Sequence, residues 1–183
     1  QQPATADLAD NLARGLAAFD RAADAGADLV AYAELAFHPF YPQRHATPDL
    51  LAHAEAIPGP TVEAFQARCA DRGVVCILNL FERDGDATYD TSPVIDADGA
   101  LLGRSRMLHI TEYECFHEQG YYDPGDTGLT VYETAAGRVG VAICYDRHYP
   151  EVMRGLAIKG AQLVCIPQAG AVGEWPEGLY EAE

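Results

Sequence analysis

Positive charge is scarce in this chain. Its 183 residues include 12 Lys and Arg against 28 Asp and Glu, which gives a formal net charge of −16 and a pI of about 4.5. Binding to nucleic acid or to anionic lipid depends on clustered basic residues, so we expect neither kind of partner. No apolar run approaches the roughly 20 residues that a membrane-spanning helix needs, and no basic-then-apolar leader opens the sequence. We therefore expect a cytoplasmic protein.

Cysteine is also sparse and irregularly spaced. The five cysteines, an odd number, lie far apart and mostly within apolar segments, which is typical of reduced thiols rather than of a disulfide framework. Cys115 and His117 lie close together with His109 nearby, but the sequence has no CxxC pair and no HExxH motif. We therefore expect no metal site and no cofactor.

The sequence does contain an alternation of helical and strand-like segments. Leu8, Leu12, Leu16 and Phe19 recur at near-helical spacing and predict a first helix. Further helices are expected at residues 61–72 and 150–159, and strands at 29–33, 74–81, 89–95, 101–107, 129–134, 138–144 and 163–167. Residues 109–126 have no clear period and predict a long surface loop, a type of segment that is often functional. This interleaving predicts an α/β layered domain with a mixed sheet.

We expect one domain over residues 1–183, and an incomplete one. The first predicted element is a helix with no strand before it, and residues 177–183 stop as another helix begins. A sheet that lacked its neighbours on both sides would expose unpaired edges, which are costly. The native chain is therefore expected to be longer.

Cys144 stands at the end of a predicted strand, just before a turn and Pro150. Gly140 and Ala142 share its face of the strand and leave room beside the thiol. Open α/β sheets bind ligands outside the carboxyl ends of their strands, and a nucleophile on a strand-to-helix turn is exposed near backbone N–H groups. Cys144 is therefore a candidate nucleophile. The alternative is a small buried structural residue, which is the commoner role of a free cysteine.

Several motifs stand in order along the chain. They are Ala33-Glu34-Leu35, Arg106-x-x-His109-Ile110, Pro124-Gly125-Asp126-Thr127-Gly128, Ile143-Cys144-Tyr145-Asp146-Arg147-His148-Tyr149-Pro150-Glu151 and Gly160-Ala161-Gln162-Leu163-Val164. In order and approximate spacing they are similar to the motifs of the nitrilase superfamily, which this chain resembles over nearly its whole length. True nitrilases typically have Trp-Glu in place of Tyr145-Asp146, so the chain looks more like the amidases, β-ureidopropionases and N-carbamoyl amino acid amidohydrolases. The resemblance implies amide or ureido substrates rather than nitriles.

The resemblance also implies a fold and a catalytic set. The fold is an α-β-β-α sandwich, here truncated at both ends, that pairs through its helices into homodimers or larger assemblies. The set is a Glu, Lys and Cys triad with a second Glu: by motif, Cys144 is the nucleophile, Glu34 the general base and Glu118 the second glutamate. A thiolate attacks the carbonyl carbon, a carboxylate passes the proton to the departing amine, and water cleaves the thioester. Alternatively, Glu34 is a surface carboxylate and Glu118 a solvated loop residue.

The family's lysine position, two residues before His109, holds Met107 in this chain. A thioether carries no charge and donates no hydrogen bond, and loss of one oxyanion donor commonly lowers a rate about a hundredfold to a thousandfold. The only lysine, Lys159, lies on the helix predicted after the nucleophile. We expect that Arg104 or Arg106 substitutes in part, or that this subgroup has a modified mechanism; arginine stabilises charge better than it donates a proton.

A group of residues after the nucleophile is assigned to substrate binding: Tyr145, Arg147 and His148. Arg147 resembles the position that holds the substrate carboxylate in carbamoyl amino acid hydrolases, or else it pairs with Glu151, four residues on. His148 and His109 are alternatively structural residues held by hydrogen bonds. Two aromatic residues are expected to line either the pocket or an interface: Trp175 and Tyr121.

The resemblance thus predicts a hydrolase that cleaves a non-peptide C–N bond of a small linear amide or N-carbamoyl compound through a Cys144 thioester. The alternative is a catalytically impaired homologue, with Met107 in place of the lysine, that binds an amide-like ligand or acts through an oligomer interface. A cysteine protease that pairs Cys144 with His148 is a third possibility.

Overall fold

The computed structural model describes residues 4–170 and residue 178. Its helices are α1 (Leu8–Asp24), α2 (Pro48–Leu51), α3 (Pro60–Arg72) and α4 (Pro150–Ile158), with 3-10 turns η1 (Tyr41–Gln43), η2 (Glu118–Gly120) and η3 (Cys144–His148). The strands are β1 (Leu29–Ala31), β2 (Val75–Ile77), β3 (Leu80–Asp84), β4 (Ala87–Ile95), β5 (Leu101–Arg106), β6 (Glu112–Tyr113), β7 (Phe116–His117), β8 (Val131–Thr134), β9 (Gly137–Val141) and β10 (Leu163–Cys165). Across the described ranges, no helix has the length and apolar character needed to cross a bilayer.

Five strands form the larger sheet, with β4 at its centre. β1 runs parallel to β2, whereas β2, β3 and β5 all pair antiparallel with β4. Helices α1 and α3 cover the outer face of this sheet, because each turns an apolar side toward it. The core between the helices and the sheet contains Phe19, Phe37, Val62, Phe65, Cys69, Val74, Cys76, Leu78 and Ile95.

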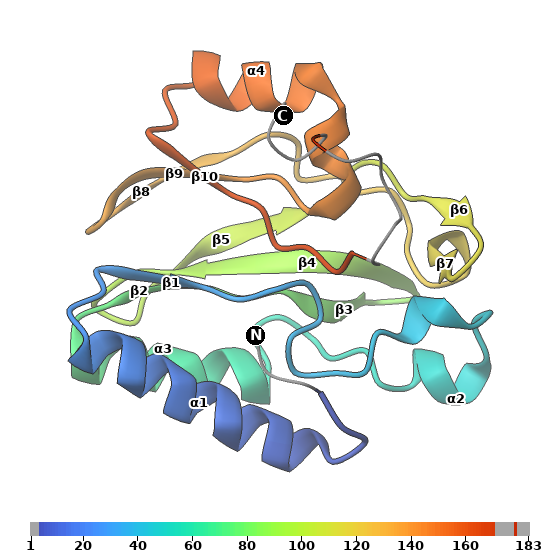
Figure 1. The fold of residues 1–183 in the computed structure, drawn as a ribbon, viewed down its shortest axis with the longest axis horizontal. Helices are drawn as coiled ribbons and strands as arrows, with labels where there is room; N and C mark the ends of the chain where they lie inside the picture. Colours follow the sequence, from blue (N-terminus) through green and yellow to red (C-terminus); the bar gives the residue numbers. More distant parts are fainter. Residues whose placement is uncertain (1–3, 171–177, 179–183) are drawn as a thin grey trace.

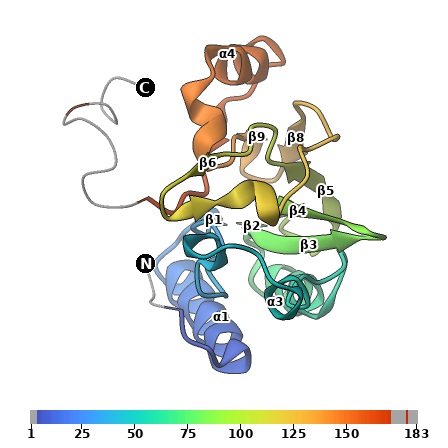
Figure 2. The same cartoon turned by 90° about the vertical axis from the view of Figure 1, so that its right-hand side faces the viewer.

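Three strands form the second sheet, in which β9 pairs antiparallel with β8 and parallel with β10. Its inner face packs on the first sheet in a core made of Ile77, Val94, Met107, Tyr132, Val139, Val141, Ile143, Cys144 and Cys165. Helix α4 covers the outer face through Val152 and Leu156. The layers therefore run helices, sheet, sheet, helix (Figures 1 and 2), and the predicted α-β-β-α sandwich is confirmed.

One expected strand is divided in two. The sequence predicted a single strand over residues 74–81, but β2 ends at Ile77 and β3 begins at Leu80. Asn79, fully buried at the break, accepts a hydrogen bond from Leu35 N at 2.8 Å and donates one to the carboxylate of Asp90. The break therefore places an amide between two segments that approach from elsewhere in the chain.

The expectation of a long surface loop at residues 109–126 was wrong in part. Strands β6 and β7 pair here as a short hairpin, and η2 follows them. Thr111, Phe116 and Glu118 are buried, because this segment folds over the end of the sandwich rather than into solvent. Trp175 and the helix expected from residue 177 lie outside the described residues.

Candidate active site

Cys144 lies at the turn between β9 and α4. Its backbone φ of +45° is in the left-handed region, which a residue with a side chain enters only at a cost of about 1–2 kcal/mol. The backbone is held there by the bond from Cys144 N to Pro167 O at 2.8 Å. The side chain is 8% exposed, and its sulfur lies 4.0 Å from Ala169 O. The turn therefore fixes a nearly buried thiol in one orientation.

Glu34 meets this thiol although it lies 110 positions earlier in the sequence. It follows the first strand of the larger sheet, and its buried carboxyl group lies close enough to Cys144 to raise the pKa of the thiol. Glu34 Oε2 also accepts a bond from Ala169 N at 2.7 Å. Leu35, the next residue, has a φ of +46° and is held by Asn79. The carboxyl group is thus oriented from both ends, and it is buried rather than on the surface.

Glu118 forms a second acidic wall of the site. It is fully buried in η2, and its Oε2 accepts bonds from Thr111 N at 3.1 Å and from Thr111 Oγ1 at 2.9 Å. Its charge acts on both Cys144 and Glu34. The reading of Glu118 as a solvated loop residue is therefore wrong.

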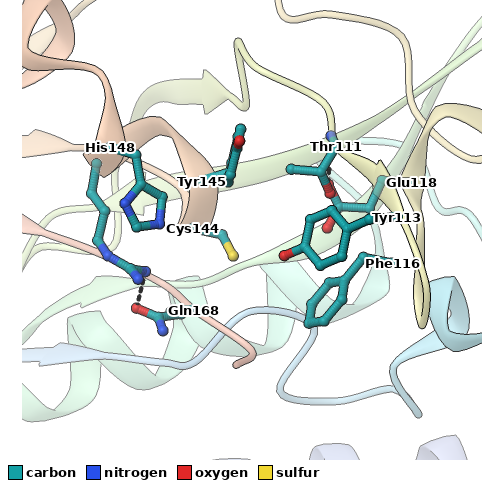
Figure 3. Close-up of a pocket in the computed structure, with 9 residues that line it drawn as sticks. Thr111, Tyr113, Phe116, Glu118, Cys144, Tyr145, His148 and Gln168 are labelled. Carbon is teal, nitrogen blue, oxygen red and sulfur yellow. Dashed lines mark hydrogen bonds between the residues drawn. The ribbon is translucent and has the colours of Figure 1, made fainter. Parts of the chain in front are cut away.

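A pocket surrounds the thiol (Figure 3), and the residues assigned to substrate binding line it. Its lining consists of Thr111, Tyr113, Phe116, Glu118, Cys144, Tyr145, Arg147, His148 and Gln168. Arg147 donates a hydrogen bond from Nη1 to Gln168 Oε1, and Figure 3 shows Gln168 on the other side of Cys144 from Glu118. The cavity has a volume of about 10 Å³, which is room for about one water molecule. Side chains must therefore move to admit a substrate.

Burial governs the electrostatics of these groups. It raises the pKa of the Cys144 thiol well above the usual value, and the carboxylates of Glu34 and Glu118 raise it further. Burial likewise raises the pKa of Glu34, with the charges of Asp90 and Glu118 adding to the effect. Both the thiol and its acidic partner are therefore held toward their uncharged forms.

Asp90, a residue of β4, is a member of the site that the sequence reasoning missed. It is fully buried, and burial raises its pKa to about 6 against the opposing hydrogen bonds of Glu34 and Asn79. Its Oδ2 and Glu34 Oε1 are buried and have no hydrogen-bond partner within the described residues. A run of polar residues, Asp90-Thr91-Ser92, within an otherwise apolar strand was the available signal.

Met107 adjoins this group. Its side chain is fully buried in the core cluster that contains Cys144. Its backbone N donates to Asp90 O at 2.9 Å, and its O accepts from Gly125 N at 2.8 Å. The position that holds a lysine in the family motif therefore presents a thioether beside buried carboxyl groups.

Arg104 and Arg106 form ion pairs with acidic residues away from the Cys144 thiol. The Arg106 guanidinium bonds Glu82 at 2.7 and 2.9 Å, Asp84 at 2.6 Å and Asp126 at 2.8 Å. Arg104 bonds Glu82 at 3.0 Å and Asp84 at 3.1 Å. Neither arginine lines the pocket at the thiol. The structure therefore gives no support to either one as a replacement for the lysine.

Two other residues have structural roles. His109 Nδ1 lies 2.7 Å from Asp146 Oδ1, and its ring stacks on Tyr149 with centroids 3.5 Å apart, as expected of a structural histidine. Tyr121 is buried, and its OH donates to backbone carbonyls of residues 41 and 44 rather than into the pocket. His148 does line the pocket, but the charges that act on the Cys144 thiol are those of Glu34 and Glu118, which favours a carboxylate-assisted site over a Cys144–His148 pair.

Comparison with known proteins gives consistent matches. The family model for carbon-nitrogen hydrolase matches residues 1–180. N-carbamoylputrescine amidase from Solanum lycopersicum is 34% identical over 174 residues, which cover 94% of this chain and 57% of that protein. Citrullinase from Francisella tularensis subsp. tularensis is 32% identical over 161 residues, 88% of this chain and 56% of that one. The crystal structure of a carbon-nitrogen hydrolase from Helicobacter pylori G27 superposes with a TM-score of 0.88 at 26% identity, over 100% of this chain and 63% of that one. The chain thus spans a little over half the length of these curated relatives.

Proposed function

Since this chain belongs to the carbon-nitrogen hydrolase family, we propose that it carries the nucleophile of an enzyme that cleaves a non-peptide C–N bond in a small linear amide or N-carbamoyl compound. The observation that carries this proposal is the proximity of the buried carboxyl groups of Glu34 and Glu118 to Cys144, which lines one pocket together with Glu118. A thiol with a neighbouring carboxyl group that can take its proton is an arrangement suited to covalent acyl transfer.

The proposed reaction has two halves. In the first, Glu34 takes the proton of Cys144, the thiolate adds to the substrate carbonyl carbon, and the C–N bond breaks as Glu34 passes that proton to the leaving nitrogen. In the second, Glu34 takes a proton from water as the water oxygen adds to the thioester carbon, and the C–S bond breaks as Glu34 returns that proton to the sulfur, which releases the acid product and restores the thiol. Glu118, which faces the same sulfur, orients the amide or ureido nitrogen by accepting its N–H.

We further propose that Asp90 serves the proton balance of this site. The buried carboxyl groups of Glu34 and Asp90 lie close enough to shift each other's pKa, and two carboxyl groups can hydrogen-bond to each other only when one of them carries a proton. A shared proton neutralises one of the two buried charges, as a lysine ammonium at position 107 would do. The same proton keeps Glu34 a weaker base for the thiol, so we expect slow turnover that rises as the pH rises.

Ureido compounds are the substrate class that we favour. The names of the two relatives, N-carbamoylputrescine amidase and citrullinase, denote such compounds for those proteins. In this chain, Arg147 lines the pocket beside Cys144, and a guanidinium binds carboxylates in a bidentate manner. We propose that Arg147 binds the carboxylate of an N-carbamoyl amino acid, with Tyr145 and His148 completing the substrate contacts.

The setting and assembly are also proposals. All five cysteines are free thiols, and four of them are buried, which suits a reducing cytoplasm.

Ile158 of α4 and Leu163 of β10 are 79% and 47% exposed on the outer layer of the sandwich. We propose that this apolar face mediates pairing into a homodimer or a larger homo-oligomer.

Ammonia release from N-carbamoyl amino acids and simple amides tests the activity. We expect slow release by the protein, loss of about a hundredfold or more in Cys144→Ser, and no loss in Cys165→Ser, which alters another buried thiol of the same core. Equal release by all three proteins would contradict the role of Cys144. The absence of release from the protein and from its Met107→Lys variant would favour the alternative, an impaired homologue that binds amide-like ligands.

A further inference from the structure

Three metal-binding side chains meet on the surface outside the Cys144 pocket. They are His45, Glu112 and His117, and each offers one ligand atom such that all three atoms lie within 4.8 Å of one another. The rings of His45 and His117 have centroids 3.8 Å apart, and His117 Nδ1 lies 2.8 Å from Glu112 Oε1. The three groups are therefore already in mutual contact.

The backbones that carry these side chains are anchored. Glu112 and His117 are directly opposed partners in the β6–β7 hairpin, so the pairing itself brings carboxylate and imidazole together. His45 comes from the segment between η1 and α2, where Tyr121 OH donates to Arg44 O at 2.9 Å. The hairpin packs near the start of η1 through Phe116, whose ring lies 5.4 Å from that of Phe40. Figure 1 shows β6 and β7 beside this part of the chain.

The donor set selects a class of ion. Two imidazoles and one carboxylate suit Zn²⁺ and the other late first-row divalent ions, whereas Mg²⁺ and Ca²⁺ prefer oxygen ligands alone. Ligand atoms around a tetrahedral Zn²⁺ lie about 3.3 Å apart, given metal–ligand distances near 2.0–2.1 Å. The ligand atoms of the three side chains lie within 4.8 Å of one another. Rotation of these side chains would bring their ligand atoms to the separation that the ion requires.

We propose that His45, Glu112 and His117 form a binding site for a divalent transition-metal ion such as Zn²⁺, with at least one coordination position open to water. Binding would replace the hydrogen bond between Glu112 and His117 with two metal–ligand bonds, and it would join the hairpin to the segment before α2. The same hairpin supplies Tyr113 and Phe116 to the wall of the Cys144 pocket. The bound ion would therefore restrict the movement that admits a substrate.

Calorimetric titration of the reduced, untagged protein with Zn²⁺ tests the site directly and does not depend on catalysis. We expect one equivalent to bind, with affinity lowered about tenfold or more in His45→Ala, in His117→Ala and in Glu112→Gln. His53→Ala removes an exposed histidine outside the cluster and serves as the control. Cys115→Ser and Cys144→Ser control for binding by thiols.

The affinities of the variants for Zn²⁺ decide whether the site exists. Retained affinity in the His53, Cys115 and Cys144 variants, with loss in the three cluster variants, would establish the site. Unchanged affinity in His45→Ala and His117→Ala would overturn the proposal, as would loss of binding in either serine variant alone. His45 and Glu112 are exposed and lie on separate segments, so misfolding of one variant does not decide the result.

Discussion

At the level of single residues, Met107 should limit the chemistry of the site. Its buried side chain belongs to the core cluster that contains Cys144, and its backbone bonds that of Asp90, so an ammonium group there would have buried carboxyl groups nearby to offset the cost of burial. We therefore expect Met107→Lys to release ammonia about tenfold faster or more. Met107→Leu, which keeps the volume and adds no charge, should stay within about threefold of the unaltered protein.

Steady-state ammonia release measures both variants, and circular dichroism shows whether each is folded. A folded Met107→Lys protein that is no faster than the unaltered protein would mean that a missing cation does not limit the reaction.

The raised pKa of Asp90 predicts how the stability of the protein depends on pH. Its pKa is raised in the folded state, so its contribution is fully present below its unfolded pKa, near 3.8, and is lost as the pH rises through about 6. The rise from 3.8 to about 6 corresponds to about 3 kcal/mol. We therefore expect Asp90→Asn to gain stability relative to the unaltered protein by up to about this amount between pH 4 and pH 7.5.

Urea unfolding at several pH values checks this difference. Asp71→Asn, on the exposed side of α3, is the control and should follow the unaltered protein at every pH. A constant difference between Asp90→Asn and the unaltered protein across this range would show that Asp90 does not hold an additional proton.

At the level of elements, the end of β5 depends on close contact with Gly125. A Cβ added there would lie 2.6 Å from Arg106 O and 2.7 Å from Arg106 Cβ, next to Met107. We expect Gly125→Ala to cost about 1–3 kcal/mol of stability, as overpacking does, and also to lower activity because the strand end must shift.

Gly26→Ala is the matched control for this substitution. Gly26 has a φ of +87°, and an added Cβ there would meet nothing within 4 Å. It should lose about 1 kcal/mol through backbone strain alone and keep its activity. Chemical denaturation and ammonia release measure both variants. Equal activity in the two would contradict the link between the strand end and the site.

Elements with a local cause were predictable from the sequence. The expected helices at residues 61–72 and 150–159 match α3 and α4, since each begins at a proline and repeats apolar residues at helical spacing. The break between β2 and β3 was not predictable, because Asn79 is held by Leu35 and Asp90 from distant segments. Tertiary partners, rather than local propensity, decide such a position.

The residues of the site likewise divide into those that the sequence could indicate and those that only the fold brings together. Cys144, Glu34 and Glu118 were named as candidates because family motifs mark them, and Cys144 also because it stands at the end of a predicted strand. Asp90 carries no such mark, and neither does the cluster of His45, Glu112 and His117. Their proximity comes from the fold, so only the structure could join them.

At the level of the whole molecule, the exposed apolar side chains around α4 predict self-association. Replacing Ile158 and Leu163 together with serine removes most of this surface, and we expect the assembly to dissociate to a smaller species. Leu102→Ser, which alters a 39% exposed leucine on β5, is the control. Light scattering after size exclusion gives the masses. An unchanged mass in the double variant would place the interface elsewhere or remove it.

The central claim is that Glu34 and Cys144 act together on one substrate carbonyl. Intact mass spectrometry of the acid-quenched protein after incubation with an N-carbamoyl amino acid tests it most directly. We expect a single acyl adduct that maps to Cys144, is absent in Cys144→Ser, and forms about a hundredfold more slowly in Glu34→Gln. An adduct on another cysteine, or ammonia release that Glu34→Gln leaves unchanged without any adduct on Cys144, would contradict the claim.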